Sequence, residues 1–337
     1  MEISQLDPSD DAALQAWYDV YRAALTEGRE HHSAYAFEEI RAVLRTPTPS
    51  RRHRPLQARV GDEVVGVASI WVPLLENRST LQVELTVRPD CWGRGIGSAL
   101  LAAVERVAHE EGRTVLLGEA AYPYEAPADG SGTSPVEFAR RRGFTFGLGD
   151  VQRVLDLPTP DELLDRLVEH ATERHRGYTF RQFSGAAPDE LTTGLAELRG
   201  AVETEAPTGD IPRERGAVDL DALRADEEAL SQQGRTRHTT VALAPDGSLA
   251  GYTDLVVPEF DPSWIYQWGT LVWSAHRGHR LGLALKARNA AWVQRRFPHR
   301  RAIRTWNAEV NDHMVAVNQA MGFRPVERLA ELQKRLA

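Results

Sequence analysis

The chain has 337 residues, of which 42% are hydrophobic and 26% charged, and its formal net charge is −8. These values are typical of a folded protein with two domains of about 150 residues each, and they exclude a disordered chain. The acidic balance argues against a nucleic-acid partner. A single cysteine, Cys91, excludes an internal disulfide and a multi-cysteine metal site.

Neither a membrane partner nor secretion is expected from the sequence. No segment approaches the roughly 18 unbroken apolar residues that a membrane span needs. The segment from Met1 to Asp11 carries acidic residues where a signal peptide would be basic and then apolar. The sequence therefore predicts a cytoplasmic protein.

The first half of the chain predicts helices, then a hairpin, then a Gly-rich turn. Helical segments are expected at 14–25 and 36–44, and Gly61 to Gly66 predicts a hairpin turn followed by a strand. A strand ending at Val87, a Gly-rich turn and an amphipathic helix come next, followed by another strand, a second helix and a Gly-Phe ending at 143–144.

A helix is predicted between the two halves of the chain. Asp161 to Arg174 places four apolar side chains on one helical face. We therefore expect domains at 1–155 and 178–337, with a linker helix within 156–177.

The second half repeats the first. Three pairs of landmarks lie 185 residues apart, and the Gly-Phe endings at 143–144 and 322–323 lie 179 apart. A constant spacing of this kind indicates a duplicated α/β unit. The three pairs are Gly66 with Gly251, Val87 with Val272, and Gly97 with Gly282.

The Gly-rich turn of the first copy suits a phosphate ligand. Glycines at 93, 95 and 97 let a backbone approach a ligand closely, and the helix N-terminus behind them favours a diphosphate. A dinucleotide site uses a similar turn. However, this strand does not open a βαβ run, and no acidic residue ends a second strand at the expected distance.

Val87-x-Pro89 followed by Gly93-x-Gly95-x-Gly97, in a β-rich unit that ends in Gly-Phe, resembles motif A of the GNAT acyltransferase superfamily. The resemblance implies that acetyl-CoA is the acyl donor. Its diphosphate would be held by the turn, and its thioester carbonyl by the preceding strand. Trp92 stands where the family usually has Arg or Gln. The implied binding residues are Val87, Gly93, Arg94, Gly95, Ile96, Gly97 and Ser98.

The second copy departs from this pattern, because Arg280 replaces the middle glycine and predicts a tighter or empty turn. Arg277, His279, Arg280 and Lys286 make the loop basic, which suits either a polyphosphate or a solvated surface. The implied binding residues are Val272, Arg277, Gly278, His279, Arg280, Leu281, Gly282, Asn307 and Asn311, of which Asn311 also suits a helix N-cap.

The resemblance covers roughly residues 2–154 and 178–326, a layout shared with tandem GNAT proteins such as mycothiol synthase-like enzymes. It implies an α/β (α+β) fold of two GNAT-type domains, each with a mixed, largely antiparallel sheet flanked by helices. The implied activity is transfer of an acetyl group to the amine of a small molecule. A catalytically silent acyl-CoA sensor or scaffold and a protein N-acetyltransferase stay open as alternatives, as does the oligomeric state.

Acetyl transfer to an amine needs a base, because an alkyl ammonium of pKa ~10.4 is mostly protonated at neutral pH. Glu84, three residues before Val87, is the predicted base; the alternative is an exposed strand residue paired across the sheet. Its counterpart in the second copy is Gly269, with Tyr266 and Gln267 as nearby substitutes.

The general acid is harder to assign. Many members of the family carry a tyrosine four residues before the Gly-Phe glycine, where this chain has Ala139 and Asn318. Tyr122 and Tyr124 are the candidates in the first copy, with loop packing as the alternative role.

The acceptor pocket is expected in divergent segments, at Glu30 to His32 and in the acidic loop 203–210, which alternatively is a solvated surface loop. His31 and His32 lack a third ligand at helical spacing, so no metal site is predicted.

Overall fold

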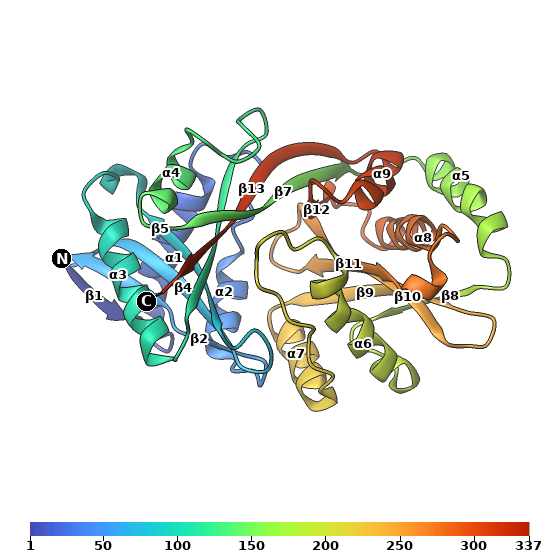
Figure 1. Cartoon of the computed structure of the whole chain (residues 1–337), viewed down its shortest axis with the longest axis horizontal. Helices are drawn as coiled ribbons and strands as arrows, with labels where there is room; N and C mark the ends of the chain where they lie inside the picture. Colours follow the sequence, from blue (N-terminus) through green and yellow to red (C-terminus); the bar gives the residue numbers. More distant parts are fainter. Residues whose placement is uncertain (337) are drawn as a thin grey trace. The chain divides into compact units, whose positions relative to one another are not determined.

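In the computed structural model, which describes residues 1–336, the chain divides into two units (Figure 1). The first unit contains Met1–Leu148, Asp210–Pro212 and the residues from Leu329 onward, and the second contains Gly149–Gly209 and Arg213–Arg328. Each unit has a mixed sheet flanked by helices, so the predicted fold class is confirmed.

The first unit begins with a short strand and two helices. The Asp10 side chain caps the first helix by accepting a hydrogen bond of 2.9 Å from the backbone N–H of Ala12. The helices are α1 (Asp11–Thr26), α2 (Phe37–Arg45), α3 (Ile96–Glu110) and α4 (Ser134–Arg140). The strands are β1 (Glu2–Gln5), β2 (Arg51–His53), β3 (Leu56–Val60), β4 (Glu63–Pro73), β5 (Thr80–Val87) and β6 (Val115–Pro123).

The sheet of the first unit follows the order β1-β3-β4-β5-β6, and β2 pairs with β4. All these pairs are antiparallel except β5 with β6, which is parallel. The predicted hairpin is confirmed, because Val60 pairs with Glu63 around a two-residue turn. Gly66 then lets α3 lie close to β4, since a Cβ there would be 2.8 Å from Ile96 Cγ2.

The second unit repeats this plan, with antiparallel pairs β8-β9-β10-β11 and a parallel pair of β11 with β12. Its strands are β8 (Thr179–Ser184), β9 (Arg235–Leu243), β10 (Leu249–Pro258), β11 (Trp264–Val272) and β12 (Ala302–Ala308). Its helices are α5 (Asp161–Thr172), α6 (Asp189–Glu205), α7 (Leu220–Gln232), α8 (Leu281–Arg296) and α9 (Asp312–Met321). The helix predicted as a linker, α5, packs in this unit, where Leu164 shares a core with Ala287 of α8.

Two long strands run from one unit into the other: β7 (Thr145–Asp156) and β13 (Arg324–Arg335). The C-terminal part of β13 is the neighbour of β6 and is the red strand that reaches the C-terminus in Figure 1. Ala330 and Leu332 of this segment are fully buried in the core of the first unit. The repeat in the sequence does not reveal this return of the C-terminal residues to the first unit.

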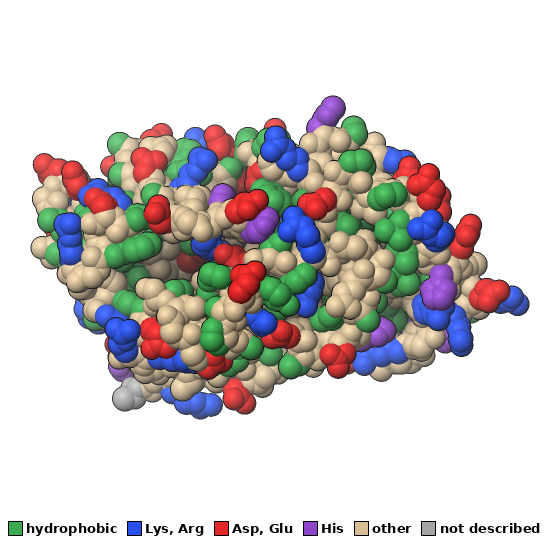
Figure 2. All heavy atoms as spheres, turned by 90° about the horizontal axis from the view of Figure 1, so that it is seen from above, with side chains coloured by type: hydrophobic (Ala, Val, Ile, Leu, Met, Phe, Trp, Pro, Cys, Tyr) green, Lys and Arg blue, Asp and Glu red, His purple; other side chains and the backbone are tan. Residues whose placement is uncertain are grey.

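No helix within residues 1–336 is long and apolar enough to cross a membrane. On the face shown in Figure 2, acidic and basic side chains are interspersed.

Candidate active site

The parallel strands of the first unit separate before they end. β5 and β6 pair from Thr80 with Val115 to Val83 with Gly118, yet β5 continues to Val87 and β6 to Pro123. In the second unit, β11 and β12 pair only as far as Tyr266 with Arg304 before both continue. In each unit, the residues that follow the last parallel pair have backbone N–H and C=O groups along one edge that do not pair with the neighbouring parallel strand. These residues are Glu84–Val87 in the first unit and Gln267–Val272 in the second.

The Gly-rich turn follows this edge directly. Gly93 and Gly95 have φ of 77° and 82°, the left-handed region that favours glycine. Gly95 is the N-cap of α3, so the unpaired N–H groups of the first helical turn begin here. Gly93, Arg94 and Gly95 are exposed, and a Cβ at either glycine would meet no atom within 4 Å. This turn is open to a ligand.

Gly97 has another role than close approach to a ligand. It is buried, and a Cβ there would lie 2.9 Å from Cε2 of Phe138. Ile96 is also buried, with 4% of its surface exposed. The interpretation that all three glycines face the ligand is therefore corrected: the third allows α3 to pack against the side chain of Phe138 from α4.

Arg142, which was not predicted from the sequence, follows α4, and its side chain reaches the start of α3. Arg142 donates hydrogen bonds to Ser98 Oγ from Nε, at 3.1 Å, and from Nη2, and its guanidinium lies 3.8 Å from the centre of the Phe138 ring. A cation at a helix N-terminus opposes the helix dipole unless an anion binds there. The only sequence signal was that Arg142 has Met321 as its counterpart in the second copy.

Trp92 makes the hydrogen bond in the first unit that an arginine makes in the second. Its Nε1 donates a hydrogen bond of 2.7 Å to Val87 O. In the second unit, Nε of Arg277 donates at 3.4 Å to Val272 O, the equivalent acceptor. The indole therefore closes the turn of the first unit as the guanidinium closes that of the second.

Glu84 lies on β5 just past the last pair with β6, opposite Ser69 of β4. The side chain is half-buried, and burial raises the pKa of its carboxyl group to about 7, although the positive charge of Arg29 acts in the other direction. A carboxyl group of this pKa accepts and releases protons at neutral pH, as a general base requires.

The two candidate acids differ in their surroundings. Tyr122 is 2% exposed, and its hydroxyl group donates a 2.7 Å hydrogen bond to Ala128 O. This placement matches the loop-packing alternative. Tyr124 is half-buried in the turn after β6. Cys91 is buried in the core of the same unit.

The turn of the second unit keeps its backbone shape despite Arg280. Gly278 has φ of 83°, and Arg280 adopts the left-handed conformation with φ of 55°, as the N-cap of α8. The predicted tightening of this turn is therefore wrong. The arginine takes the conformation that Gly95 has in the first unit.

The basic side chains of this second turn contact other parts of the second unit. Arg277 pairs with Glu205 at 2.7 Å, His279 Nδ1 lies 2.8 Å from Arg174 O, and Arg280 donates a 2.9 Å hydrogen bond to His170 O. Lys286 does not belong to the loop, because it is 1% exposed and donates to Asn318 Oδ1 at 2.7 Å. Of the four residues predicted to make this loop basic, three thus contact neighbouring groups of the unit and Lys286 lies outside the loop.

The remaining predicted residues of the second turn and its surroundings have structural partners. Asn311 caps α9 by accepting a hydrogen bond from Met314 N at 3.2 Å. Asn307 Oδ1 accepts hydrogen bonds from Arg153 and Asn318. Leu281 is buried, whereas Gly282 has open space around its Cα.

The second unit has no room for a base at the position of Glu84. A Cβ on Gly269 would clash with the hydroxyl oxygen of Tyr252, which is 2% exposed. Tyr266 is buried and stacks on Trp306, and the Gln267 amide is held by several hydrogen bonds, including one of 2.8 Å to Asp254 O. Neither predicted substitute carries a carboxylate toward the strand edge.

The chain is similar to known proteins in sequence and in fold. Residues 14–129 match the model of the acetyltransferase (GNAT) family. The chain is similar to a tandem GNAT protein from the clavulanic acid biosynthesis pathway, with a TM-score of 0.81 and 28% identity over 99% of this chain and 98% of that one.

Two further solved structures share the fold. A GCN5-related N-acetyltransferase from Sphaerobacter thermophilus aligns with a TM-score of 0.67 and 16% identity over 99% of this chain and 95% of that chain. Saccharomyces cerevisiae N-myristoyltransferase with bound myristoyl-CoA aligns with a TM-score of 0.59 and 12% identity over 99% and 78% of the two chains. A sequence search among curated proteins found no match. Residues 14–129 thus match the acetyltransferase (GNAT) family, and the chain over its whole length is similar to a tandem GNAT protein.

Proposed function

We propose that the first unit transfers the acetyl group of acetyl-CoA directly to the amine of a small molecule, with Glu84 as the general base. The observation that carries this proposal is the position of Glu84, a half-buried carboxyl group with a pKa of about 7 where β5 and β6 separate. The open turn at Gly93 and Gly95 lies at the end of the same strand.

Acetyl-CoA, the acyl donor, binds at the Gly-rich turn of the first unit. The N-terminal N–H groups of α3 and the guanidinium of Arg142 supply donors and positive charge for the diphosphate. The free backbone edge of β5 supplies groups for the pantetheine arm and N–H donors for the oxyanion that forms during transfer.

The chemistry has three steps. The Glu84 carboxylate takes a proton from the ammonium group of the acceptor, directly or through water. The neutral nitrogen attacks the thioester carbonyl carbon. The nitrogen of the tetrahedral intermediate releases its second proton to water, and the C–S bond breaks to give an amide and the CoA thiolate. The thiolate takes its proton from solvent or from Tyr124, because the Tyr122 hydroxyl donates its hydrogen bond to Ala128 O.

A small-molecule acceptor is supported by the tandem neighbour, whose name assigns it to the biosynthesis of clavulanic acid, a small molecule. The second unit is assigned no transfer step, because Gly269 replaces the carboxylate and the Tyr252 hydroxyl fills the adjacent space.

One observation favours a catalytically silent acyl-CoA sensor instead. The position of the family's general acid holds Ala139 in the first unit and Asn318 in the second, and both side chains are buried. A silent protein would bind acetyl-CoA without releasing thiol in the presence of any amine.

The test is thiol release from acetyl-CoA by the full chain with a panel of small amines and lysine peptides. We expect turnover with a small amine, and a kcat/KM at pH 7 lowered about 10²–10⁴-fold in Glu84→Gln with acetyl-CoA affinity unchanged. The activity of the natural protein should rise with pH through about 7, the pKa of Glu84, and the variant should lose this limb. Glu2→Gln, at an exposed strand position, is the matched control.

Three outcomes would contradict the proposal. Tight acetyl-CoA binding without turnover would indicate the sensor. Turnover with lysine peptides alone would indicate a protein acetyltransferase. Full activity of Glu84→Gln would exclude this residue as the base.

A further inference from the structure

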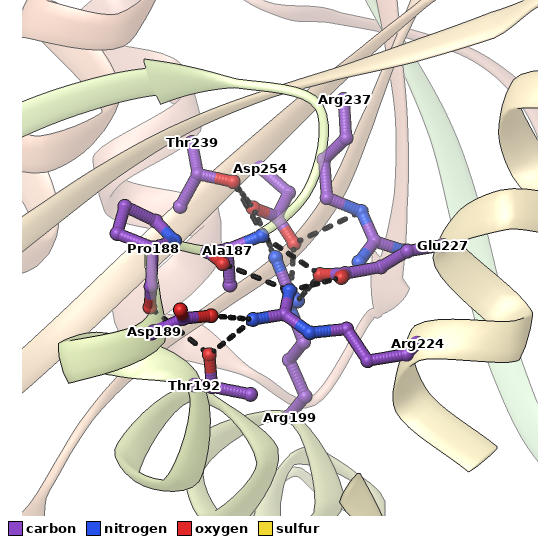
Figure 3. Close-up of polar contacts among 10 residues, drawn as sticks. All are labelled: Ala187, Pro188, Asp189, Thr192, Arg199, Arg224, Glu227, Arg237, Thr239 and Asp254. Carbon is purple, nitrogen blue, oxygen red and sulfur yellow. Dashed lines mark hydrogen bonds and ion pairs between the residues drawn. The ribbon is translucent and has the colours of Figure 1, made fainter. Parts of the chain in front are cut away.

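A cluster of buried charges lies in the second unit, where α6 and α7 pack on β9 and β10. Figure 3 shows Asp254 of β10 between two arginines, Arg199 of α6 and Arg237 of β9. The Asp254 side chain is 4% exposed. Its carboxylate lies 3.2 Å from Arg199 Nε and 3.7 Å from Arg237 Nε, and it accepts a 2.6 Å hydrogen bond from the Thr239 hydroxyl. One carboxylate thus serves two guanidinium groups.

The second buried carboxylate of the cluster has other partners. Glu227, whose side chain is 7% exposed, accepts hydrogen bonds from Arg224 at 2.7 Å and from Ala187 N at 3.0 Å. It also lies 3.6 Å from Arg199 Nη1. Among residues 1–336, the ion pair of Arg237 is therefore with Asp254 and not with Glu227, whose negative charge acts on Arg237 only from a longer distance.

Arg237 is the cation with the least compensation. Its side chain is 15% exposed, its buried Nε has no hydrogen-bond acceptor, and among residues 1–336 its only ion-pair partner is Asp254 at 3.7 Å. The guanidinium also lies 5.4 Å from the centre of the Trp268 ring. Burial, together with the positive charge of Arg199, lowers the pKa of the Arg237 guanidinium. Buried donors without acceptors cost free energy, so Arg237 has donors to offer an external anion.

A cavity of about 330 Å³ lies against this arginine. Its volume is in the range of small-molecule sites. Three arginines and two glutamates from two elements contribute to its wall: Arg235 and Arg237 of β9, and Arg224, Glu227 and Glu228 of α7. Loop residues Gly185 and Ala186 contribute another side.

The fold itself does not need these charges. By the shared strand register, the first unit has Ser69 at the position of Asp254 and His53 at that of Arg237. Burial lowers the pKa of His53 to about 4, so this pair is uncharged at neutral pH. The equivalent strands of the first unit therefore pair without buried ions at these positions. Burying an ion costs desolvation free energy, so the charges of the second unit are not required by the fold.

We propose that this cavity binds a small organic oxyanion, a carboxylate or a phosphate monoester, and that Arg237 is the principal anion-binding residue. The guanidinium fork of arginine matches both groups in two parallel hydrogen bonds. The second unit then acts as an anion-binding module, a role that does not depend on acetyl transfer by the first unit.

The probes are succinate and glycerol phosphate, titrated into the full chain by calorimetry against chloride at equal ionic strength, with uncharged succinamide and glycerol as controls. We expect saturable binding of at least one anion and none of the uncharged molecules. The preferred anion identifies the source as carboxylate or phosphate. Saturation by neither anion would overturn the proposal.

Variants separate binding from folding. Arg237→Gln should weaken binding about thirtyfold or more, Arg237→Lys should weaken it less, and Arg181→Gln, at an exposed position of β8, should not change it. Without anion, Arg237→Gln should melt at the same temperature as the natural protein or higher, because it removes a poorly compensated buried cation.

Unchanged affinity in Arg237→Gln would overturn the assignment. A lower melting temperature of that variant without an effect on anion binding would indicate a purely structural ion pair. Acetyl-CoA affinity, measured on the same samples, reports separately on the first unit.

Discussion

Glu84 and Gly269 occupy equivalent strand positions, and the environment of each decides its chemistry. In the first unit a carboxyl group fits there and burial raises its pKa. In the second unit, the Tyr252 hydroxyl takes the space that a side chain would need. The sequence predicted both residues, but the reason for the glycine is visible only in the packing around it.

Replacing Glu84 should change stability in a pH-dependent way. Its folded-state pKa of about 7 lies above its ordinary value of 4.5, so the protonated form is the one that the fold favours. This contribution is complete below pH 4.5 and is lost as pH rises through about 7. We expect Glu84→Gln to gain about 1–3 kcal/mol in unfolding free energy relative to the natural protein between those pH values. Urea unfolding across this range measures the gain, and a constant difference would contradict it.

The two helix-start glycines should respond differently to alanine. Gly97→Ala should destabilise the protein by about 1–3 kcal/mol, because the new methyl group would press on the Phe138 ring. Gly282→Ala should be neutral or stabilising by up to about 1 kcal/mol, because its surroundings are open and alanine favours the helix. Thermal unfolding of both variants measures the contrast. Equal melting temperatures would show that Phe138 yields without cost.

At the scale of elements, the start of α3 combines three sources of attraction for a diphosphate: the unpaired N–H groups, the helix dipole and Arg142. The start of α8 has the same backbone, but contacts with carbonyl groups and with Glu205 engage its basic side chains. Equal backbone geometry therefore does not give equal affinity for an anion.

Removing the positive charge of Arg142 should weaken the binding of acetyl-CoA. We expect Arg142→Gln to lower acetyl-CoA affinity about tenfold or more, since a hydrogen bond to a charged group contributes about 1.5–3 kcal/mol. The effect should shrink at high salt, because the contact is electrostatic. Calorimetry measures both, with Arg141→Gln, at an exposed neighbouring position, as control. An unchanged affinity would place the diphosphate elsewhere.

At the scale of the whole molecule, residues from Leu329 onward contribute to the first unit although they follow the second in the chain. The core around Leu116 and Leu100 includes Leu332, so residues of β13 belong to the core of the first unit. Removal of the C-terminal segment is therefore expected to affect the donor site of the first unit.

A single substitution tests this dependence. Leu332→Ala should destabilise the first unit by about 2–5 kcal/mol through the cavity it leaves, and should weaken acetyl-CoA binding when the unit is partly unfolded. Arg335→Ala, exposed on the same strand, should change neither quantity. Hydrogen exchange of α3 amides is the readout. Unchanged protection in Leu332→Ala would contradict the structural role of this strand.

The sequence by itself determined the duplicated plan, the Gly-rich turn and Glu84, because repeats, glycine spacing and strand periodicity are local properties of the chain. Only the tertiary structure decided that Gly97 packs on Phe138, that Arg142 reaches Ser98, and that Arg199, Asp254 and Arg237 meet beside a cavity. Each of these contacts joins residues that are distant in the sequence. Their burial, pKa shifts and unused donors arise from packing, which periodicity does not encode.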